Sequence, residues 1–285
     1  MDRKKKIDQI GIAIKPHAPG IEKILKEIMS YLERQGINCL LEEVAARKLN
    51  LSGGCRREDL AALSQAIIVL GGDGTLLSIA APAARAGVPV IGLNLGRLGF
   101  LTEIPVDEAL PVLEAFLKDE NGFISRRTLL EVKYKDQADL CLNDVVLNKG
   151  ALARMIEMLI SINGQEVTRL KGDGLILSSP TGSTAYSLSA GGPIVHPGVE
   201  TIILTPICPH TLSFRPLLIP ADSDIKIKLL SPEEKVFITI DGQRGQTIDK
   251  NEIIEVKKSV LELQLVASPW RSYYNLVKEK LGWAE

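Results

Sequence analysis

The first third of the chain alternates short apolar runs with segments of helical periodicity. Two apolar runs, residues 66–70 and 88–94, are typical of buried strands, and the small residues at 75–86 between them favour a helix. Residues 45–60 are rich in Gly, Arg and Asn, and we expect a loop there. An apolar run at 10–15 precedes a segment with helical spacing of its apolar residues, which are Ile21, Ile24, Leu25, Ile28 and Leu32. Strands and helices in this order predict parallel strands joined by right-handed crossovers.

The periodicity changes near residue 125, where apolar and polar residues begin to alternate. Residues 128–135, 224–230 and 235–240 each place every second apolar side chain on one face, as strands with one buried face do. Asn163–Gly164 and Asp241–Gly242 are dipeptides typical of tight hairpin turns. The second part of the chain is therefore predicted to be an antiparallel β domain.

The end of the chain predicts a closing helix. Ser268 is a candidate N-cap, and Pro269 suits the first helical position. An amphipathic helix needs a covered apolar stripe, and we expect the first domain to cover this one. The predicted stripe consists of Trp270, Tyr274, Val277 and Leu281.

Together these patterns predict two domains. We expect a Rossmann-like α/β domain over residues 1–124, to which residues 268–285 return, and an antiparallel β-sandwich-like domain over residues 125–267. The chain has 285 residues, which is enough for two ordinary domains with their own cores. Its content of 45% hydrophobic and 24% charged residues is typical of globular proteins.

Charge and cysteine content exclude several classes of protein. The net charge of −1 gives no overall electrostatic footprint for nucleic acid, and no apolar run approaches the ~20 residues of a membrane span. The four cysteines lie far apart without a CxxC pair, so we expect neither a structural metal site nor a disulfide framework. The first residues lack the apolar stretch of a signal peptide, which predicts a cytoplasmic protein.

A glycine-rich turn lies where the apolar run at 66–70 meets the helix predicted over 75–86. Gly71, Gly72 and Gly74 allow the backbone to approach a ligand closely. The N-terminus of a helix attracts phosphate through its free N–H groups and its dipole. The turn matches neither GxxxxGK[ST] nor GxGxxG, so it is not one of the common phosphate loops.

Asp73 lies inside this turn, although phosphate repels a carboxylate. One interpretation is that Asp73 caps the helix that begins near Thr75. The other is that it orients an attacking hydroxyl and accepts its proton during phosphoryl transfer, in which the protein mainly positions groups and balances charge. In that case Mg²⁺ or another divalent cation, bound by the phosphates of the donor, offsets the local negative charge.

A second motif, residues 171–197, is unusually rich in Gly, Ser and Thr. A strand-like run precedes its hydroxyl-rich part, and Tyr186 and Leu188 can pack. Small side chains and hydroxyls suit a polar pocket wall that binds sugar hydroxyls and phosphate. A flexible loop is the alternative interpretation.

The GGDGT turn with its helix resembles a kinase superfamily that includes 6-phosphofructokinases, diacylglycerol-type lipid kinases and NAD kinases. With residues 171–197, the chain closely resembles the NAD kinase family of the bacterial type. The resemblance also covers 92–104, 142–150 and the closing helix, so it extends from about residue 66 to the C-terminus in the order and spacing of the family. It implies transfer of phosphate from ATP to the adenosine-ribose 2′-hydroxyl of NAD, giving NADP and ADP. A lipid kinase and a non-catalytic dinucleotide sensor are the alternatives.

The resemblance also implies which residues bind and react. Asp73 is the general base, with Gly74 beside it at the NAD site, and the pair Asn143 and Asp144 binds the dinucleotide. Of the other residues, Arg154 and Lys171 are candidate partners for the pyrophosphate, or else solvated strand residues. Ordinary turns are the alternative for the Asn-Asp pair and for Gln243. The other residues implied at the dinucleotide site are Arg154, Lys171, Asp173, Thr184, Ala185, Tyr186, Ser187, Leu188, Ser189 and Gln243.

The partners implied by the resemblance are NAD, ATP with a divalent cation, and further copies of the chain in a dimer or tetramer. No protein metal ligands are implied. The residues do not distinguish ATP from other nucleoside triphosphates or polyphosphate, nor NAD from NADH.

Overall fold

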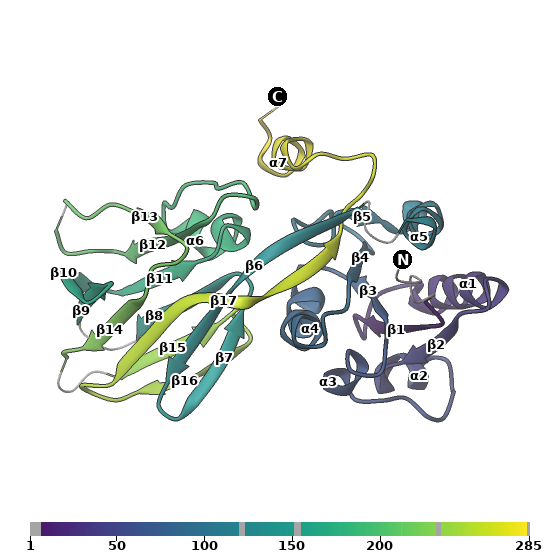
Figure 1. The fold of residues 1–285 in the computed structure, drawn as a ribbon, viewed down its shortest axis with the longest axis horizontal. Coiled ribbons are helices and arrows are strands. Elements are labelled where there is room, and N and C mark those ends of the chain that lie inside the picture. Colours follow the sequence, from purple (N-terminus) through teal and green to yellow (C-terminus); the bar gives the residue numbers. More distant parts are fainter. Residues whose placement is uncertain (1–6, 120–122, 151–154, 212, 232–234, 284–285) are drawn as a thin grey trace, which may run out of the picture. The chain divides into compact units, whose positions relative to one another are not determined.

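The computed structural model describes residues 7–119, 123–150, 155–211, 213–231 and 235–283 (Figure 1). The chain divides into two compact units: residues 1–126 with 263–285, and residues 127–262. Both crossings between the units fall inside strands, namely β6 and β17. Within the described ranges, no helix is long and apolar enough to cross a membrane.

The first unit contains a parallel sheet with helices between its strands. The sheet has the order β2-β1-β3-β4, and β5 and the end of β17 also pair in parallel with β4. Its elements are β1 (Gln9–Ile14), α1 (Ile21–Arg34), β2 (Asn38–Leu41), α2 (Glu43–Lys48), α3 (Arg57–Leu60), β3 (Ala66–Gly71), α4 (Asp73–Ala86), β4 (Val90–Asn94), β5 (Ile104–Pro105), a 3₁₀ turn η1 (Val106–Glu108), α5 (Ala109–Lys118) and α7 (Tyr273–Leu281).

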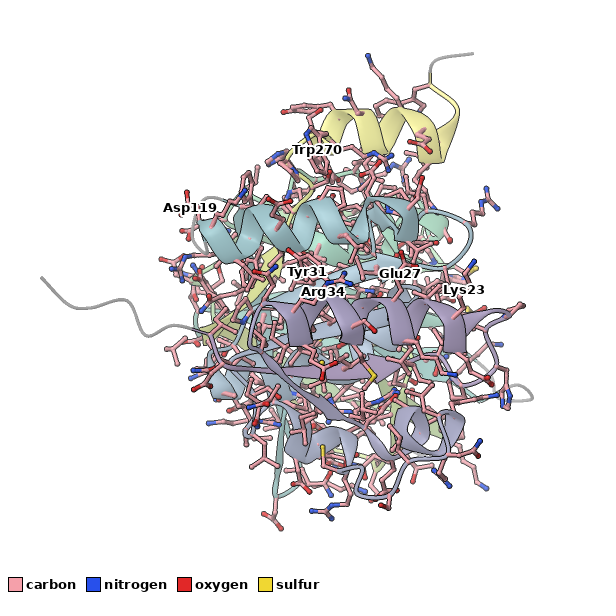
Figure 2. The ribbon with its side chains drawn as sticks, turned by 90° about the vertical axis from the view of Figure 1, so that its right-hand side faces the viewer. Lys23, Glu27, Tyr31, Arg34, Asp119 and Trp270 are labelled. Carbon is pink, nitrogen blue, oxygen red and sulfur yellow. The ribbon has the colours of Figure 1, made fainter. Side chains whose placement is uncertain are left out.

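Helices cover both faces of this sheet. Apolar residues of α1 and α5 share one core cluster with alternate residues of β1, β3 and β4. Figure 2 shows α1 and α5 side by side, with Tyr31 at their contact, where it lines a cavity with Glu114 and Leu117. On the other face α3 and α4 approach so closely that a Cβ at Gly11 would meet Leu60, and one at Gly92 would meet Leu76. This layered arrangement confirms the Rossmann-like α/β prediction.

The second unit consists of antiparallel strands in two sheets. One sheet has the order β13-β12-β11-β8-β15-β16, and the other contains β10-β9-β14-β17 together with β6 and β7. Its elements are β6 (Ile124–Tyr134), β7 (Gln137–Cys141), β8 (Asp144–Lys149), β9 (Ile156–Ile162), β10 (Gln165–Gly172), β11 (Gly174–Ser178), η2 (Thr181–Thr184), α6 (Tyr186–Ser189), β12 (Thr201–Ile207), β13 (Leu217–Pro220), β14 (Ile225–Leu229), β15 (Val236–Ile240), β16 (Arg244–Ile248) and β17 (Ile253–Val266).

The two sheets enclose one apolar core, as in a β-sandwich. Buried residues of β8, β11 and β15 belong to the same cluster as those of β9, β14 and β17. Asn163–Gly164 and Asp241–Gly242 form the predicted turns, with positive φ at all four residues, between β9 and β10 and between β15 and β16. The antiparallel β prediction is therefore confirmed.

The closing segment belongs to the first unit, as predicted, but its details differ. Helix α7 begins at Tyr273, and its N-cap is Ser272, whose Oγ accepts the N–H of Asn275 at 3.2 Å. The predicted stripe is wrong in part: Val277 is buried as expected, but Trp270 and Tyr274 are 57% and 65% exposed. The other buried side chain of α7 is Leu276, which the predicted stripe does not include.

The expected loop at 45–60 is also wrong in part. Helix α2 covers its first residues and the short α3 its last. Between them Gly54 lies against the backbone of Glu43, where a Cβ would come within 2.5 Å of its Cα. The turn composition that indicated a loop therefore belongs to the connection between two short helices.

Candidate active site

The glycine-rich turn lies where β3 ends and α4 begins. Strand β3 ends at Gly71, and α4 begins at Asp73 with Gly72 as N-cap, two residues earlier than the predicted start at Thr75. Gly71 is needed for this bend, because a Cβ there would lie 2.5 Å from Oγ1 of Thr75. The turn thus lies at the N-terminus of a helix, where the positive end of the helix dipole suits a phosphate.

The Asp73 carboxylate binds a separate segment of the first unit instead of capping its own helix. Its Oδ2 accepts the N–H of Phe100 at 2.9 Å. Its Oδ1 accepts the N–H of Leu101 at 3.1 Å and both the N–H and the hydroxyl of Thr102 at 2.9 Å. Helix α4 has no side-chain cap, so the capping interpretation of Asp73 is wrong.

The bound segment, residues 98–103, is organised to approach Asp73. Gly99 has no room for a side chain, because its Cβ would lie 2.0 Å from Oδ1 of Asp73. Asn94, at the end of β4, donates to Oγ1 of Thr102 at 3.1 Å and to the carbonyl of Arg97 at 2.7 Å. The orientation of the carboxylate is therefore determined by β4 and by the turn that follows it.

In the second unit, Asp241 binds the loop that carries Asn143 and Asp144. The Asp241 carboxylate accepts the N–H groups of Leu142 at 3.0 Å, of Asn143 at 2.7 Å and of Asp144 at 3.3 Å. In return the N–H of Asp241 donates to the carbonyl of Asp144 at 2.9 Å. The hairpin turn between β15 and β16 thereby holds the start of β8.

Asp144 and Asp241 are two acidic side chains close together, of which Asp144 is buried and Asp241 partly buried. Asp144 is buried, and this burial together with the charge of Asp241 raises the pKa of Asp144 to about 7, against the opposing effect of a hydrogen bond from the backbone of Tyr186. Burial also raises the pKa of Asp241, while the backbone N–H groups oppose the rise. Perturbed carboxyl groups of this kind are concentrated at functional sites.

These residues line a cavity of about 330 Å³ within the second unit. It brings together four residues expected at the dinucleotide site: Asn143, Asp144, Ala185 and Tyr186. The sequence did not identify the other lining residues, which are Val146, Asn148, Thr239, Asp241 and Gly242. Asp241 could have been suspected, since it lies two residues before Gln243, which the resemblance already implied at the site.

The wall formed by residues 179–192 is held by its hydroxyls and glycines. Ser179 accepts the N–H of Gly182 at 3.2 Å, and a Cβ at Gly182 would lie 2.0 Å from the carbonyl of Asn143. Buried Ser187 bonds to the hydroxyl of Thr205 at 2.8 Å. The flexible-loop interpretation of this motif is wrong, because it folds into η2 and α6 with well-defined bonds.

The other expected site residues are placed as follows. Asp173 pairs with Lys149 at 3.4 Å, and Lys171 lies exposed on β10. Gln243 follows the lining residue Gly242 and is exposed. Arg154 lies outside the described residues. In the second unit, η2 ends at Thr184, and Ala185 connects it to α6. Helix α6 contains Tyr186, Ser187, Leu188 and Ser189. In the first unit, Gly74 follows Asp73 in α4.

The described residues contain no group of three or more His, Cys, Asp or Glu side chains arranged to hold a metal ion. The Asp73 carboxylate accepts four hydrogen bonds from residues 100–102, and Asp144 and Asp241 are occupied with backbone N–H groups.

The fold and the two sites together define a nucleotide-dependent phosphotransferase. Residues 10–121 match the ATP-NAD kinase N-terminal domain, and residues 142–268 match the ATP-NAD kinase C-terminal domain. The NAD kinase of Geobacter sulfurreducens is 43% identical over 97% of this chain and 99% of its own length. The NAD kinase of Magnetococcus marinus is 40% identical over 98% and 95%. The chain therefore belongs to the NAD kinase family.

Solved structures agree with this assignment. The yeast NADH kinase complexed with NADH superposes with a TM-score of 0.89 at 30% identity, covering 98% of this chain and 89% of the other. An Archaeoglobus fulgidus NAD kinase in complex with ATP gives a TM-score of 0.79 at 26% identity, covering 95% and 98%. The activity is thus phosphorylation of the adenosine-ribose 2′-hydroxyl of NAD by ATP, and neither the lipid-kinase nor the sensor alternative is favoured.

Proposed function

We propose that Asp73 is the general base of this reaction and that Asn143 and Asp144 bind the NAD. The observation that carries the proposal for Asp73 is the unequal use of its two oxygens. Oδ1 accepts three hydrogen bonds from Leu101 and Thr102, whereas Oδ2 accepts one, from Phe100. Oδ1 serves as the anchor, and Oδ2 retains acceptor capacity for the hydroxyl proton.

The proposed NAD site is the cavity that contains the Asn143–Asp144 pair. The amide of Asn143 can bond to a base edge, and the carboxyl group of Asp144 can bond to ribose hydroxyls. Asp241 supports both by binding the backbone of their loop. The yeast relative was solved with NADH, a ligand of the same shape, which supports a dinucleotide as the occupant.

We place the ATP phosphates at the glycine-rich turn, where α4 begins at Asp73. A divalent cation such as Mg²⁺, carried by the ATP phosphates, would neutralise charge that develops during transfer. The chain contributes positioning, the dipole of α4 and the base. The Archaeoglobus fulgidus relative was solved with ATP, which supports ATP as the donor.

One set of assays tests these assignments. Purified protein is incubated with MgATP and NAD, and NADP is quantified, with EDTA, other nucleoside triphosphates, polyphosphate and NADH as separate arms. We expect MgATP and NAD to give NADP and EDTA to abolish its formation. Failure of EDTA to reduce the rate would refute the requirement for a divalent cation. Full turnover of Asp73→Asn would refute the role of Asp73 as general base.

The proposal extends to location and assembly. We propose a cytoplasmic homo-oligomer, a dimer or tetramer, in line with the resemblance. The four cysteines, Cys39, Cys55, Cys141 and Cys208, are free thiols, as suits a reducing compartment. Size-exclusion chromatography with light scattering tests the assembly, and a monomer at micromolar concentration would refute it.

A further inference from the structure

The closing segment of the chain binds the same residues that hold Asp73. Lys280 of α7 donates from Nζ to the carbonyl of Leu98 at 2.6 Å. The same ammonium group lies 5.7 Å from the ring centroid of Phe100, within the range of a cation–π interaction. Phe100 is the residue whose N–H binds Oδ2 of Asp73. Lys280 of α7 thus contacts Phe100, the residue that donates to Oδ2 of Asp73, which is the oxygen proposed to accept the proton.

A second set of contacts holds the other end of the 98–103 segment. The N–H of Ser268 donates to Oε1 of Glu103 at 2.8 Å. Arg271 donates to the carbonyl of Glu103 at 3.3 Å and pairs with Glu108 at 2.8 Å. In Figure 2, Trp270 marks where the chain passes from these contacts toward α7. Residues 268–280 therefore hold the segment at both ends.

We propose that Lys280 is a positioning residue for Asp73. Its bonds restrain Leu98 and Phe100 and thereby fix the direction of the single N–H that binds Oδ2. Without Lys280, Leu101 and Thr102 still anchor Oδ1, so the carboxylate stays in place but turns more freely about that anchor. The role does not include contact with substrate, and it rests on the proposed role of Asp73 as the base.

The position of Lys280 in α7 separates its proposed role from a contribution to the packing of the helix. Leu276 and Val277 supply the buried apolar contacts of α7, whereas Lys280 is only partly buried. Lys278 is exposed on the same turn and serves as a matched control. A change at Lys280 should therefore affect the Asp73 segment more than the folding of the chain.

The test compares Lys280→Met, Lys280→Arg and Lys278→Met in the full-length chain. We expect Lys280→Met to lower kcat by roughly ten- to a hundredfold, since misplacement of a reacting group by about 1 Å costs on the order of 10² in rate. The KM for NAD should stay within about twofold, because Lys280 is not one of the residues that line the cavity. Lys280→Arg should restore most of the rate, since arginine also donates to a carbonyl and stacks on an aromatic ring. Lys278→Met should match the unmodified chain.

A second measurement does not depend on turnover. Relative to the unmodified chain, Lys280→Met should accelerate hydrogen exchange at the amide of Phe100 more than at those of Leu101 and Thr102. Lys278→Met should leave the exchange of all three amides unchanged. A kcat within twofold of the unmodified chain, or unchanged exchange at Phe100, would overturn the proposal. A Lys280→Met chain that fails to fold would also overturn it, in favour of a purely structural role.

The Asp73→Asn background separates this inference from the proposed function. If Lys280 acts through Asp73, adding Lys280→Met to Asp73→Asn should lower kcat no further. Full turnover of Asp73→Asn alone would refute the role of Asp73. Loss of turnover in Asp73→Asn together with normal turnover in Lys280→Met would refute only the role of Lys280.

Discussion

Replacing Asp73 by Asn should separate the chemistry of this carboxylate from its structural bonds. The amide keeps one oxygen, which can continue to accept the N–H groups of Leu101 and Thr102. Its NH₂ group then faces the N–H of Phe100, so a donor meets a donor. If the Phe100 donor loses its partner, the cost is about 1–3 kcal/mol of folding free energy, toward the low end because Phe100 is only partly buried.

The effect on catalysis should be larger and of a different kind. A positioned base contributes roughly 10²–10⁴-fold, so kcat of Asp73→Asn should fall by that factor while the Kd for NAD changes far less. We would measure steady-state turnover, NAD binding by calorimetry and urea unfolding on the same preparations. The protein should remain folded at assay temperature.

Thr102→Val is the matched control for this experiment. It removes the hydroxyl that donates to Oδ1 of the same carboxylate and accepts from Asn94, but it leaves the proposed base. We expect a loss of about 1–2 kcal/mol in stability and less than about a tenfold change in kcat. Near-normal turnover of Asp73→Asn, or an equal loss of turnover in Thr102→Val, would refute the reasoning.

Three further predictions concern the second unit and the closing segment. Asn143→Ala should raise the KM for NAD by about 5–150-fold, equivalent to ~1–3 kcal/mol, with kcat less affected; an unchanged KM in steady-state assays would contradict it. Since the pKa of Asp144 is raised from 3.8 to about 7, folding takes up a proton between these values and stability falls as pH rises. The stability of Asp144→Asn relative to the unmodified chain should therefore increase as pH rises from about 4 to 7, by on the order of 2–4 kcal/mol at most, and urea unfolding that shows no gain would refute the shift. Deletion of residues 269–285 should lower the thermal midpoint, because it exposes the surface that Leu276 and Val277 cover; a truncated chain that melts like the full-length one would contradict this.

Local signals predicted the elements that carry the site. The apolar run of β3, the glycines after it and the small residues of α4 each obey a local rule, and the structure follows them within two residues. The Asp241–Gly242 turn likewise requires only the two residues that form it. Such features depend on backbone conformations that neighbouring residues determine.

The sequence does not predict the hydrogen-bond partners of the site carboxylates, because these partners lie far away in the sequence. For Asp73, the sequence leaves a helix cap and a general base as alternatives. The hydrogen bonds of its carboxylate go to residues 27–29 positions later in the chain. Asp241 binds a loop about one hundred residues before it. The predicted N-cap is also wrong: Oγ of Ser268 accepts the N–H of Trp270 in a local turn, and the helix begins only after Ser272. Short-range patterns carry no information about such partners.

In both units, a carboxylate holds a separate turn by accepting its backbone N–H groups. The two carboxylates differ in what their charge does to the stability of the folded chain. Asp73 lies at a helix N-terminus, where the dipole favours negative charge. Asp241 lies beside the buried carboxyl group of Asp144, and the pKa values of both are raised. A pair of this kind destabilises the folded chain once both groups ionise, because two negative charges then lie close together. Ligand hydroxyls that donate to the pair would relieve this cost. The unfavourable pair therefore indicates that this cavity is shaped for a polar ligand and not for stability.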